Sequence, residues 1–238
     1  MKICARGLND RQLNEQIKAA AGDVVVEECY GQRFIGTGRR EGSITIHGTP
    51  GNALGAYLDG GTITVCGNAQ DAVGDTMNGG RIVVHGSAGD ALGYAMRGGA
   101  IFVRDNAGYR TGIHMKEYED KKPTIIIGGR VGSFLGEYLA GGLVLVLGLG
   151  SDEVPVGNFT GTGMHGGRIF IRTGADLSGL PDQVTAEVAT QEDMAEILPW
   201  LTEFAVLFGH ELEQLVHDRY YVLKPNAKNP YRRLYTAN

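Results

Sequence analysis

The amino-acid sequence predicts an all-β fold: a right-handed parallel β-helix of about seven turns with helical caps at both ends. Three observations lead to this prediction: an internal repeat of nineteen residues, an aliphatic pair at the same place in each repeat, and a ladder of glycines in register with it. A repeat of this length with one short strand cannot bury its own apolar face, so successive repeats have to stack into a solenoid.

The aliphatic pairs place one short strand in each repeat. They stand two and four residues after a glycine in four successive repeats, as Ile44/Ile46, Ile63/Val65, Ile82/Val84 and Ile101/Val103. Because alternate side chains of a strand share one face, each pair is expected to point inward and the residue between its members outward. The intervening residues are Thr45, Thr64, Val83 and Phe102.

The glycine ladder predicts the corners between the strands. Gly55, Gly74, Gly93 and Gly112 also recur every nineteen residues. Glycine tolerates positive φ and weakens helices, so this ladder favours tight corners and disfavours a helix inside the repeat. The register continues backward to about Asp23 and forward to about Arg172, which gives about seven turns. Parallel strands joined in this way are expected to coil in the right-handed sense.

This register divides the chain into three segments. Residues 1–22 are expected to form a helical cap, residues 23–175 the β-helix, and residues 176–238 a second helical cap with a tail. In the first segment, Asn9 and Gln12 form a capping-box pattern, Leu13 and Ile17 share one helix face, and Gly22 is expected to end the helix. The helix is expected to cover the first turn, because a solenoid end exposes its core and an open strand edge.

Two insertions interrupt the repeat. Five residues are added near 117–123 and six near 150–156. The segment 114–122 is highly charged, and the segment 149–159 carries Asp152, Glu153 and Pro155. Insertions in a solenoid become loops on one flank, where partners often dock, and a solvated loop is the alternative for each.

The last segment has a helical pattern. Thr190 with Asp193 forms a second capping-box pattern before an apolar helix face made of Met194, Ile197, Leu198, Leu201 and Phe204. Pro199 is expected to kink or split this helix, and Gly209 to end it. A shorter helical piece, 212–216, precedes a polar tail whose Tyr231, Arg232, Arg233 and Tyr235 are expected to lie at the far end or to dock on a partner.

The composition and charge of the chain indicate which partners and which cellular compartment to expect. The net charge of −5 and the lack of a Lys/Arg stripe argue against nucleic acid as a partner. No apolar run reaches eighteen residues, so no membrane span is expected. The N-terminus lacks a signal-peptide core and the three cysteines are scattered, so we expect a cytoplasmic protein.

One outward column carries metal-binding residue types. Its members stand nineteen residues apart and are Glu28, His47, Cys66, His85 and Arg104. Stacked turns would bring neighbours to about 4.8 Å, close enough for a His-Cys-His metal site. No fourth ligand is evident, and a solvated face or a contact with another subunit is the alternative.

Carboxylates at the corners suggest a second chemistry. Aligned carboxylates can hydrolyse polysaccharides, and Asp71 and Asp90 share a column, but Asp75 does not. Aspartates at corners more often form local turns. The glycine runs are not followed by a helix, and no GxxxxGK[ST], HExxH or CxxC motif is present, so a phosphate loop, a zinc-protease site and a redox pair are not expected.

The corner glycines also have a family spacing. The pattern G-xx-G-xxx-G is complete at Gly48-Gly51-Gly55, Gly86-Gly89-Gly93 and Gly129-Gly132-Gly136, while Gly67-Gln70-Gly74 and Asp105-Gly108-Gly112 each lack one glycine. Over nearly the whole chain this resembles the GXGXG domain of the glutamate synthase large (alpha) subunit. One of the subunits of formylmethanofuran dehydrogenase looks like the same repeat.

The resemblance implies a non-catalytic structural subunit in nitrogen metabolism. It would brace a glutaminase and a flavin-containing synthase in a split glutamate synthase-like oxidoreductase complex. FMN and an iron–sulfur cluster would belong to those partner subunits, and no catalytic, cofactor-binding or metal-binding residue is assigned to this chain. A formylmethanofuran dehydrogenase subunit and a self-sufficient carbohydrate-active β-helix are the alternatives.

Overall fold

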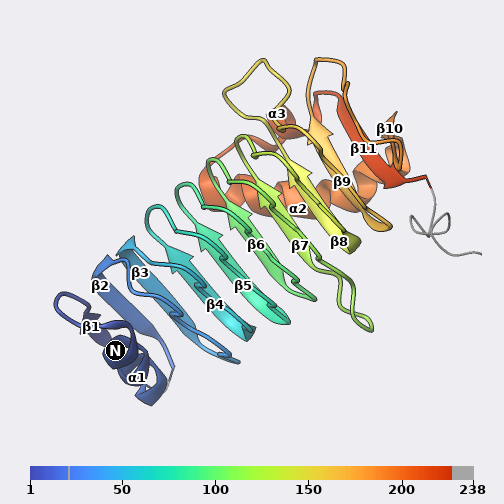
Figure 1. Ribbon diagram of the computed structural model, residues 1–238. Coiled ribbons are helices and arrows are strands. Elements are labelled where there is room, and N and C mark those ends of the chain that lie inside the picture. The colour runs from blue at the N-terminus through green and yellow to red at the C-terminus, as the bar shows by residue number, and fades with distance from the viewer. Residues whose placement is uncertain (21, 227–238) are drawn as a thin grey trace, which may run out of the picture.

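The structure is a computed structural model that describes residues 1–20 and 22–226 (Figure 1). Its helices are α1 (Asp10–Ala19), α2 (Gln191–Phe208) and α3 (Leu212–Val216). Its strands are β1 (Lys2–Cys4), β2 (Val24–Tyr30), β3 (Ser43–Thr49), β4 (Asp59–Val65), β5 (Gly79–Val84), β6 (Ala100–Val103), β7 (Thr124–Ile127), β8 (Ala140–Val146), β9 (Gly166–Arg172), β10 (Val184–Val188) and β11 (Tyr220–Pro225). The segment limits 1–22, 23–175 and 176–238 stay a prediction.

The strands confirm a mostly parallel β-solenoid. β1 to β9 lie side by side in chain order, and β2 to β9 give about eight turns instead of the expected seven. Register advances one repeat per strand, so that Ile63 pairs with Ile82 and Ile82 with Ile101. The right-handed sense stays a prediction.

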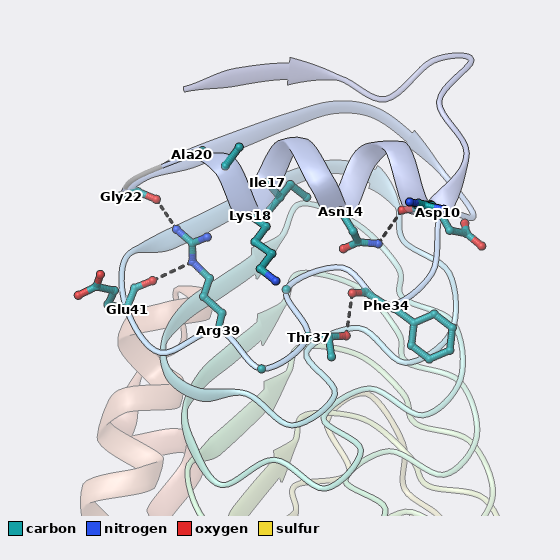
Figure 2. A pocket seen from close by; sticks show the side chains of 14 residues that line it. Asp10, Asn14, Ile17, Lys18, Ala20, Gly22, Phe34, Thr37, Arg39 and Glu41 are labelled. Atoms are coloured by element: carbon teal, nitrogen blue, oxygen red, sulfur yellow. Dashed lines mark hydrogen bonds between the residues drawn. The ribbon is translucent and has the colours of Figure 1, made fainter.

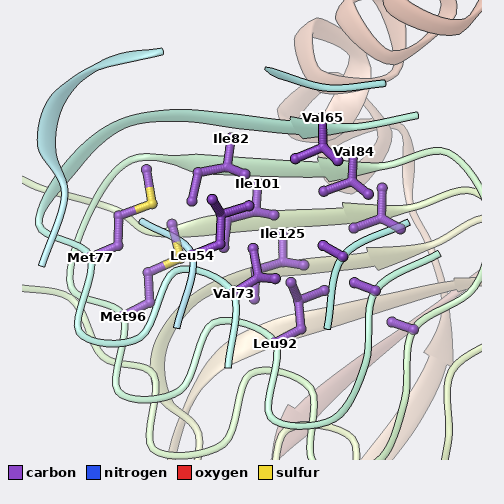
Figure 3. Packing of buried hydrophobic residues seen from close by; sticks show 14 of the residues in the cluster. Leu54, Val65, Val73, Met77, Ile82, Val84, Leu92, Met96, Ile101 and Ile125 are labelled. Carbon is purple, nitrogen blue, oxygen red and sulfur yellow. The ribbon is translucent and has the colours of Figure 1, made fainter. Parts of the chain in front are cut away.

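The predicted inward pairs form the core. Ile63 and Val65 of β4 are fully buried, and so are Ile82 and Val84 of β5. Figure 3 shows Leu54, Val73 and Leu92 entering the same interior from the corners, with Met77 and Met96 packed beside them. Each fully buried aliphatic side chain contributes about 1.5–3 kcal/mol, and this continuous ladder stabilises the stack.

One corner glycine in most turns is required by conformation and by packing together. Gly74 has φ 69°, and a Cβ built there would lie 2.4 Å from Cδ1 of Ile101. Left-handed backbone alone does not demand glycine in this fold, because Ala72 (φ 57°) and Thr76 (φ 52°) adopt it in the same corner. The approach of the isoleucine therefore explains why this column is glycine.

Helix α2 covers the outer face of the sheet and does not close its end. From β5 onward the outward residues between the inward pairs are apolar and buried. They are Val83, Phe102, Ile126, Leu145 and Phe170. They form a second core with Ile197, Leu201 and Phe204 of α2. Figure 1 shows α2 running across several strands on that side. These positions point outward, as expected, but from β5 onward α2 buries them, which the repeat pattern did not predict.

Helix α2 begins at the predicted capping box and is anchored by charge. The Thr190 hydroxyl accepts from the Asp193 N–H at 3.2 Å, and Asp193 pairs with Arg168 of β9 at 3.1 Å. Burial opposes ionisation of Asp193, but hydrogen bonds from Thr190 and the charge of Lys224 outweigh it and lower the pKa of this carboxyl. Pro199 does not split the helix, which continues to Phe208 and is capped by Gly209.

Strands extend the sheet at both ends, where helical caps were expected, and those caps are not confirmed. β1 pairs in parallel with β2, and β11 pairs antiparallel with β9 and then with β10. An open strand edge needs backbone donors and acceptors, which another strand supplies and a helix does not. Helix α1 adds Leu13 and Ile17 to the core and ends at Ala19, before Gly22. No helix in the described part of the chain has the length and apolar character to cross a membrane.

Candidate functional site

The outward column is in register along the backbone from His47 to Arg104, whereas at Glu28 the pairing of β2 with β3 shifts by one residue. The column does not form a site. The Cys66 N–H donates to the Ile46 carbonyl at 2.8 Å, and the His85 N–H to the Val65 carbonyl at 2.9 Å. The side chains, however, have separate neighbours. The His85 ring lies edge-on to Phe208 at 5.2 Å.

The two charged ends of this column are paired elsewhere. Glu28 forms an ion pair with Arg6, and Arg104 pairs with Asp105 at 2.9 Å. Within residues 1–20 and 22–226, no group of three or more His, Cys, Asp or Glu is placed to hold a metal ion. The structure therefore gives no support to a His-Cys-His metal site at His47, Cys66 and His85.

The aspartate column bonds the backbone of the next turn. Asp71 Oδ1 accepts from the Asp90 N–H at 2.9 Å, and Asp90 Oδ1 from the Tyr109 N–H at 2.8 Å. A Cβ at Gly89 or Gly108 would lie 2.1 Å from these carboxylate oxygens. The carboxylates of this column thus join successive turns, nineteen residues apart along the chain, and do not form the local turns that were expected of corner aspartates.

Other corner residues continue this side-chain ladder. Asn68 Oδ1 accepts from the Ser87 N–H at 2.8 Å, and Asn106 Oδ1 from the Arg130 N–H at 2.8 Å. Asp75 lies in a different column, as expected, and accepts from the hydroxyl of the adjacent Thr76 at 2.8 Å. Polar corner residues therefore join successive turns, which explains why they recur without forming a catalytic group.

Charged residues of both insertions contact the rest of the chain. In the first insertion Lys122 pairs with Glu196 of α2 at 2.5 Å, and Lys121 lies 3.5 Å from Asp59. In the second, Glu153 pairs with Arg130 at 2.7 Å. The loops fold back on the solenoid through these pairs. Tyr231, Arg232, Arg233 and Tyr235 of the predicted tail lie outside the described residues.

A hollow lies at the N-terminal end, between α1 and residues 34–41 of the first corner (Figure 2). This cleft has a volume of about 920 Å³. Ile17 and Lys18 line it from α1, and Phe34 and Arg39 line it from the corner. Phe34 is 52% exposed. We call this hollow the α1 cleft. The repeat pattern did not predict it, because it forms where α1 replaces a turn of the solenoid.

Charged residues of both signs line the α1 cleft, among them Lys18 and Arg39 and the carboxylates Asp10 and Glu41. The Arg39 guanidinium donates to the carbonyls of Glu41, at 2.8 Å, and Gly22. Figure 2 shows Lys18 reaching from α1 toward the corner. Within the described part of the chain neither Lys18 nor Arg39 forms an ion pair with a carboxylate. Asn14 bridges α1 to the corner by donating to the Arg33 carbonyl at 2.9 Å.

A smaller hollow of about 450 Å³ lies beside the first strands, next to Arg6, Glu28 and Cys29. Gln32 closes its base by donating to the carbonyl of Ala5 at 3.0 Å. Burial raises the pKa of the Cys29 thiol to about 11, so this cysteine stays protonated near neutral pH. Nothing in this hollow activates a nucleophile.

Comparisons with known proteins agree with the repeat pattern. The GXGXG motif family matches residues 9–227. Uncharacterized protein MJ1350 of Methanocaldococcus jannaschii is 41% identical over 251 aligned residues, covering 99% of this chain and 96% of that protein. A chain of the formyltransferase/hydrolase complex (FhcABCD) from Methylorubrum extorquens, solved by X-ray crystallography in complex with methylofuran, has a TM-score of 0.61 and 20% identity, covering 92% of this chain and 89% of that one.

These comparisons differ in what they establish. At 20% identity, the likeness to the solved chain concerns the fold. The family match spans nearly the whole chain, and it includes the corners whose glycines receive the isoleucines and carboxylates of neighbouring turns. The chain belongs to the GXGXG motif family, the family of the GXGXG domain of the glutamate synthase alpha subunit.

Proposed function

We propose that this chain is a non-catalytic structural subunit of a multi-subunit enzyme complex. Its membership of the GXGXG motif family carries the proposal. The use of the Asp71 and Asp90 carboxylates as acceptors for backbone N–H groups is in keeping with it. The solved chain of similar fold is itself part of a complex, the formyltransferase/hydrolase complex.

The complex we favour is a cytoplasmic glutamate synthase-like oxidoreductase. The shared family with the glutamate synthase domain supports this choice. In it, a glutaminase would release ammonia and a flavin-containing synthase would consume it. The partners would carry FMN and the iron–sulfur cluster, and this chain would hold the two in a fixed arrangement. A rigid solenoid suits that role, because each turn is bonded to its neighbours along its length.

Native purification tests the proposal. The full chain is tagged in its source cells, the assembly is isolated by size, and its proteins are identified by mass spectrometry against untagged cells. Flavin absorbance, iron content and glutamine-dependent glutamate formation are measured on the same fraction. A flavoprotein and a glutaminase in stoichiometric amounts are expected. A chain that elutes alone at native concentration would contradict the proposal.

A formyl-transferring assembly is the second candidate, and the likeness to a chain of the formyltransferase/hydrolase complex favours it. The same purification separates the two candidates. Partners that transfer or release formyl groups, without flavin and without glutaminase activity, would select the second one. Both candidates assign this chain a structural role, so neither predicts activity from the chain alone.

A further inference from the structure

The α1 cleft lies where the hydrogen-bond ladder of one corner stops. In the next turn this ladder is complete: the Gly55 N–H donates to the Ile35 carbonyl at 2.8 Å, and the Asp59 N–H donates to the Arg39 carbonyl at 2.8 Å. The Ala56 carbonyl accepts from the Gly38 N–H at 2.9 Å. Every one of these bonds joins a turn to the turn before it.

The equivalent groups of the first turn stand nineteen residues earlier and are the Gly36 N–H, the Thr37 carbonyl and the Arg40 N–H. Gly36 and Thr37 line the cleft, and Arg40 follows directly after the lining residue Arg39. Within residues 1–20 and 22–226 none of the three has a hydrogen-bond partner. These backbone groups follow one another along the edge as donor, acceptor and donor. An extended chain that adds to a sheet pairs with groups in this order.

Helix α1 meets only part of this requirement. In the next turn the Asn52 carbonyl accepts from the Phe34 N–H at 3.0 Å. Its first-turn equivalent, the Arg33 carbonyl, accepts instead from the Asn14 side chain of α1 at 2.9 Å. A side chain thus substitutes for the missing turn at one position. Beyond that position the cleft separates α1 from the edge.

We propose that the α1 cleft receives an extended segment of a partner subunit, which adds one more rung to this corner and places an acidic side chain against Lys18 and Arg39. The proposal rests on the proposed function, since it names how this chain docks in its complex. The two cations without a carboxylate partner in the described part of the chain favour an acidic segment. The volume of about 920 Å³ accommodates several extended residues.

Hydrogen–deuterium exchange on the native complex and on the free full chain tests the added rung. Exchange of the peptide covering 34–42 should slow at least about tenfold in the complex, because Gly36 and Arg40 gain acceptors. The peptide covering 53–61 is the internal control, since its equivalent groups are already bonded. Zero-length carbodiimide cross-linking should join Lys18 to Asp or Glu within one contiguous partner peptide.

Charge reversal tests the acidic partner. Lys18→Glu should reduce the partner recovered with the chain about tenfold. Lys116→Glu should leave recovery unchanged, because Lys116 is also exposed and without an ion pair among described residues but does not line the cleft. Circular dichroism checks that both variants are folded. Equal recovery with the two variants would overturn the proposal.

The outcomes separate this inference from the proposed function. A complex that forms while residues 34–42 exchange as in the free chain would overturn the docking site and leave the structural-subunit function standing. A chain with no partner at native concentration would overturn both. Slowed exchange at 34–42, unchanged exchange at 53–61 and loss of the partner only with Lys18→Glu would establish the site.

Discussion

Replacing Gly74 by alanine tests the packing that we infer for the corners. Two costs are expected. The left-handed φ of 69° costs an L-residue about 1–2 kcal/mol. The new Cβ would also lie 2.4 Å from Cδ1 of Ile101, and overpacking of a core costs about 1–3 kcal/mol. Gly74→Ala should therefore lower the free energy of unfolding by about 2–5 kcal/mol.

A matched substitution isolates the steric part. Gly38 occupies a left-handed corner position as well, with φ 65°, but a Cβ added there would meet no atom within 4 Å. Gly38→Ala should cost only the conformational share, about 1–2 kcal/mol. Urea unfolding followed by far-UV circular dichroism measures both variants, with equal m-values required for the comparison.

Shortening the isoleucine provides a rescue. Ile101→Val removes the Cδ1 atom that the new methyl group would strike, at a cost of its own of about 0.5–1.5 kcal/mol. In the double variant the two changes should be less than additive by about 1–3 kcal/mol, the overpacking share. Additive effects, or equal losses for Gly74→Ala and Gly38→Ala, would refute the account of the corners.

The remaining predictions concern the second core, the aspartate column and the buried thiol. Phe102→Ala empties a fully buried site under α2 and should cost about 3–5 kcal/mol in chemical denaturation, whereas Thr64→Ala, at the equivalent position that α2 leaves uncovered, should cost less than about 0.5 kcal/mol. Similar losses would contradict the placement of α2. Asp90→Ala should cost about 0.5–1.5 kcal/mol because the Tyr109 N–H loses its acceptor, and Asp90→Asn should restore most of it in the same assay. The Cys29 thiol, with its pKa raised by burial from 9.0 to about 11, should react with iodoacetamide at pH 8 far more slowly than the two exposed cysteines. Because the unfolded thiol loses its proton first, native stability should also fall as the pH rises from about 9 toward 11. The Cys29→Ala variant is the control and should show a shallower fall over this range, since burial also raises the pKa of Tyr220 in both proteins.

Much of the fold could be predicted because its information is local and repeated. Inward pairs such as Ile63 and Val65 alternate along a strand, and the same alternation recurs in each turn, so one repeat predicts the next. Both capping boxes, at Asn9 and at Thr190, could be predicted for the same reason, since each needs only residues three apart. The period alone thus determined a solenoid.

The candidate site depended on contacts that no period encodes. The sequence placed His47, Cys66 and His85 in one column, but the end of α2 brought Phe208 against His85. The sequence did contain a signal for α2. The outward residues between the inward pairs change from Thr45 and Thr64 to apolar residues further along the chain, but periodicity does not say which segment covers such a face.

The sequence by itself determined the repeating unit, the residues that point inward and the family of the chain. Only the tertiary structure decided where α2 packs, that strands β1 and β11 extend the two ends, and that the Gly36 and Arg40 N–H groups of the first corner have no partner within the described part of the chain. The physical reason is the range of the interactions. A repeat bonds to its neighbours by the same geometry each time, whereas the ends of a stack are satisfied by whichever segments can reach them.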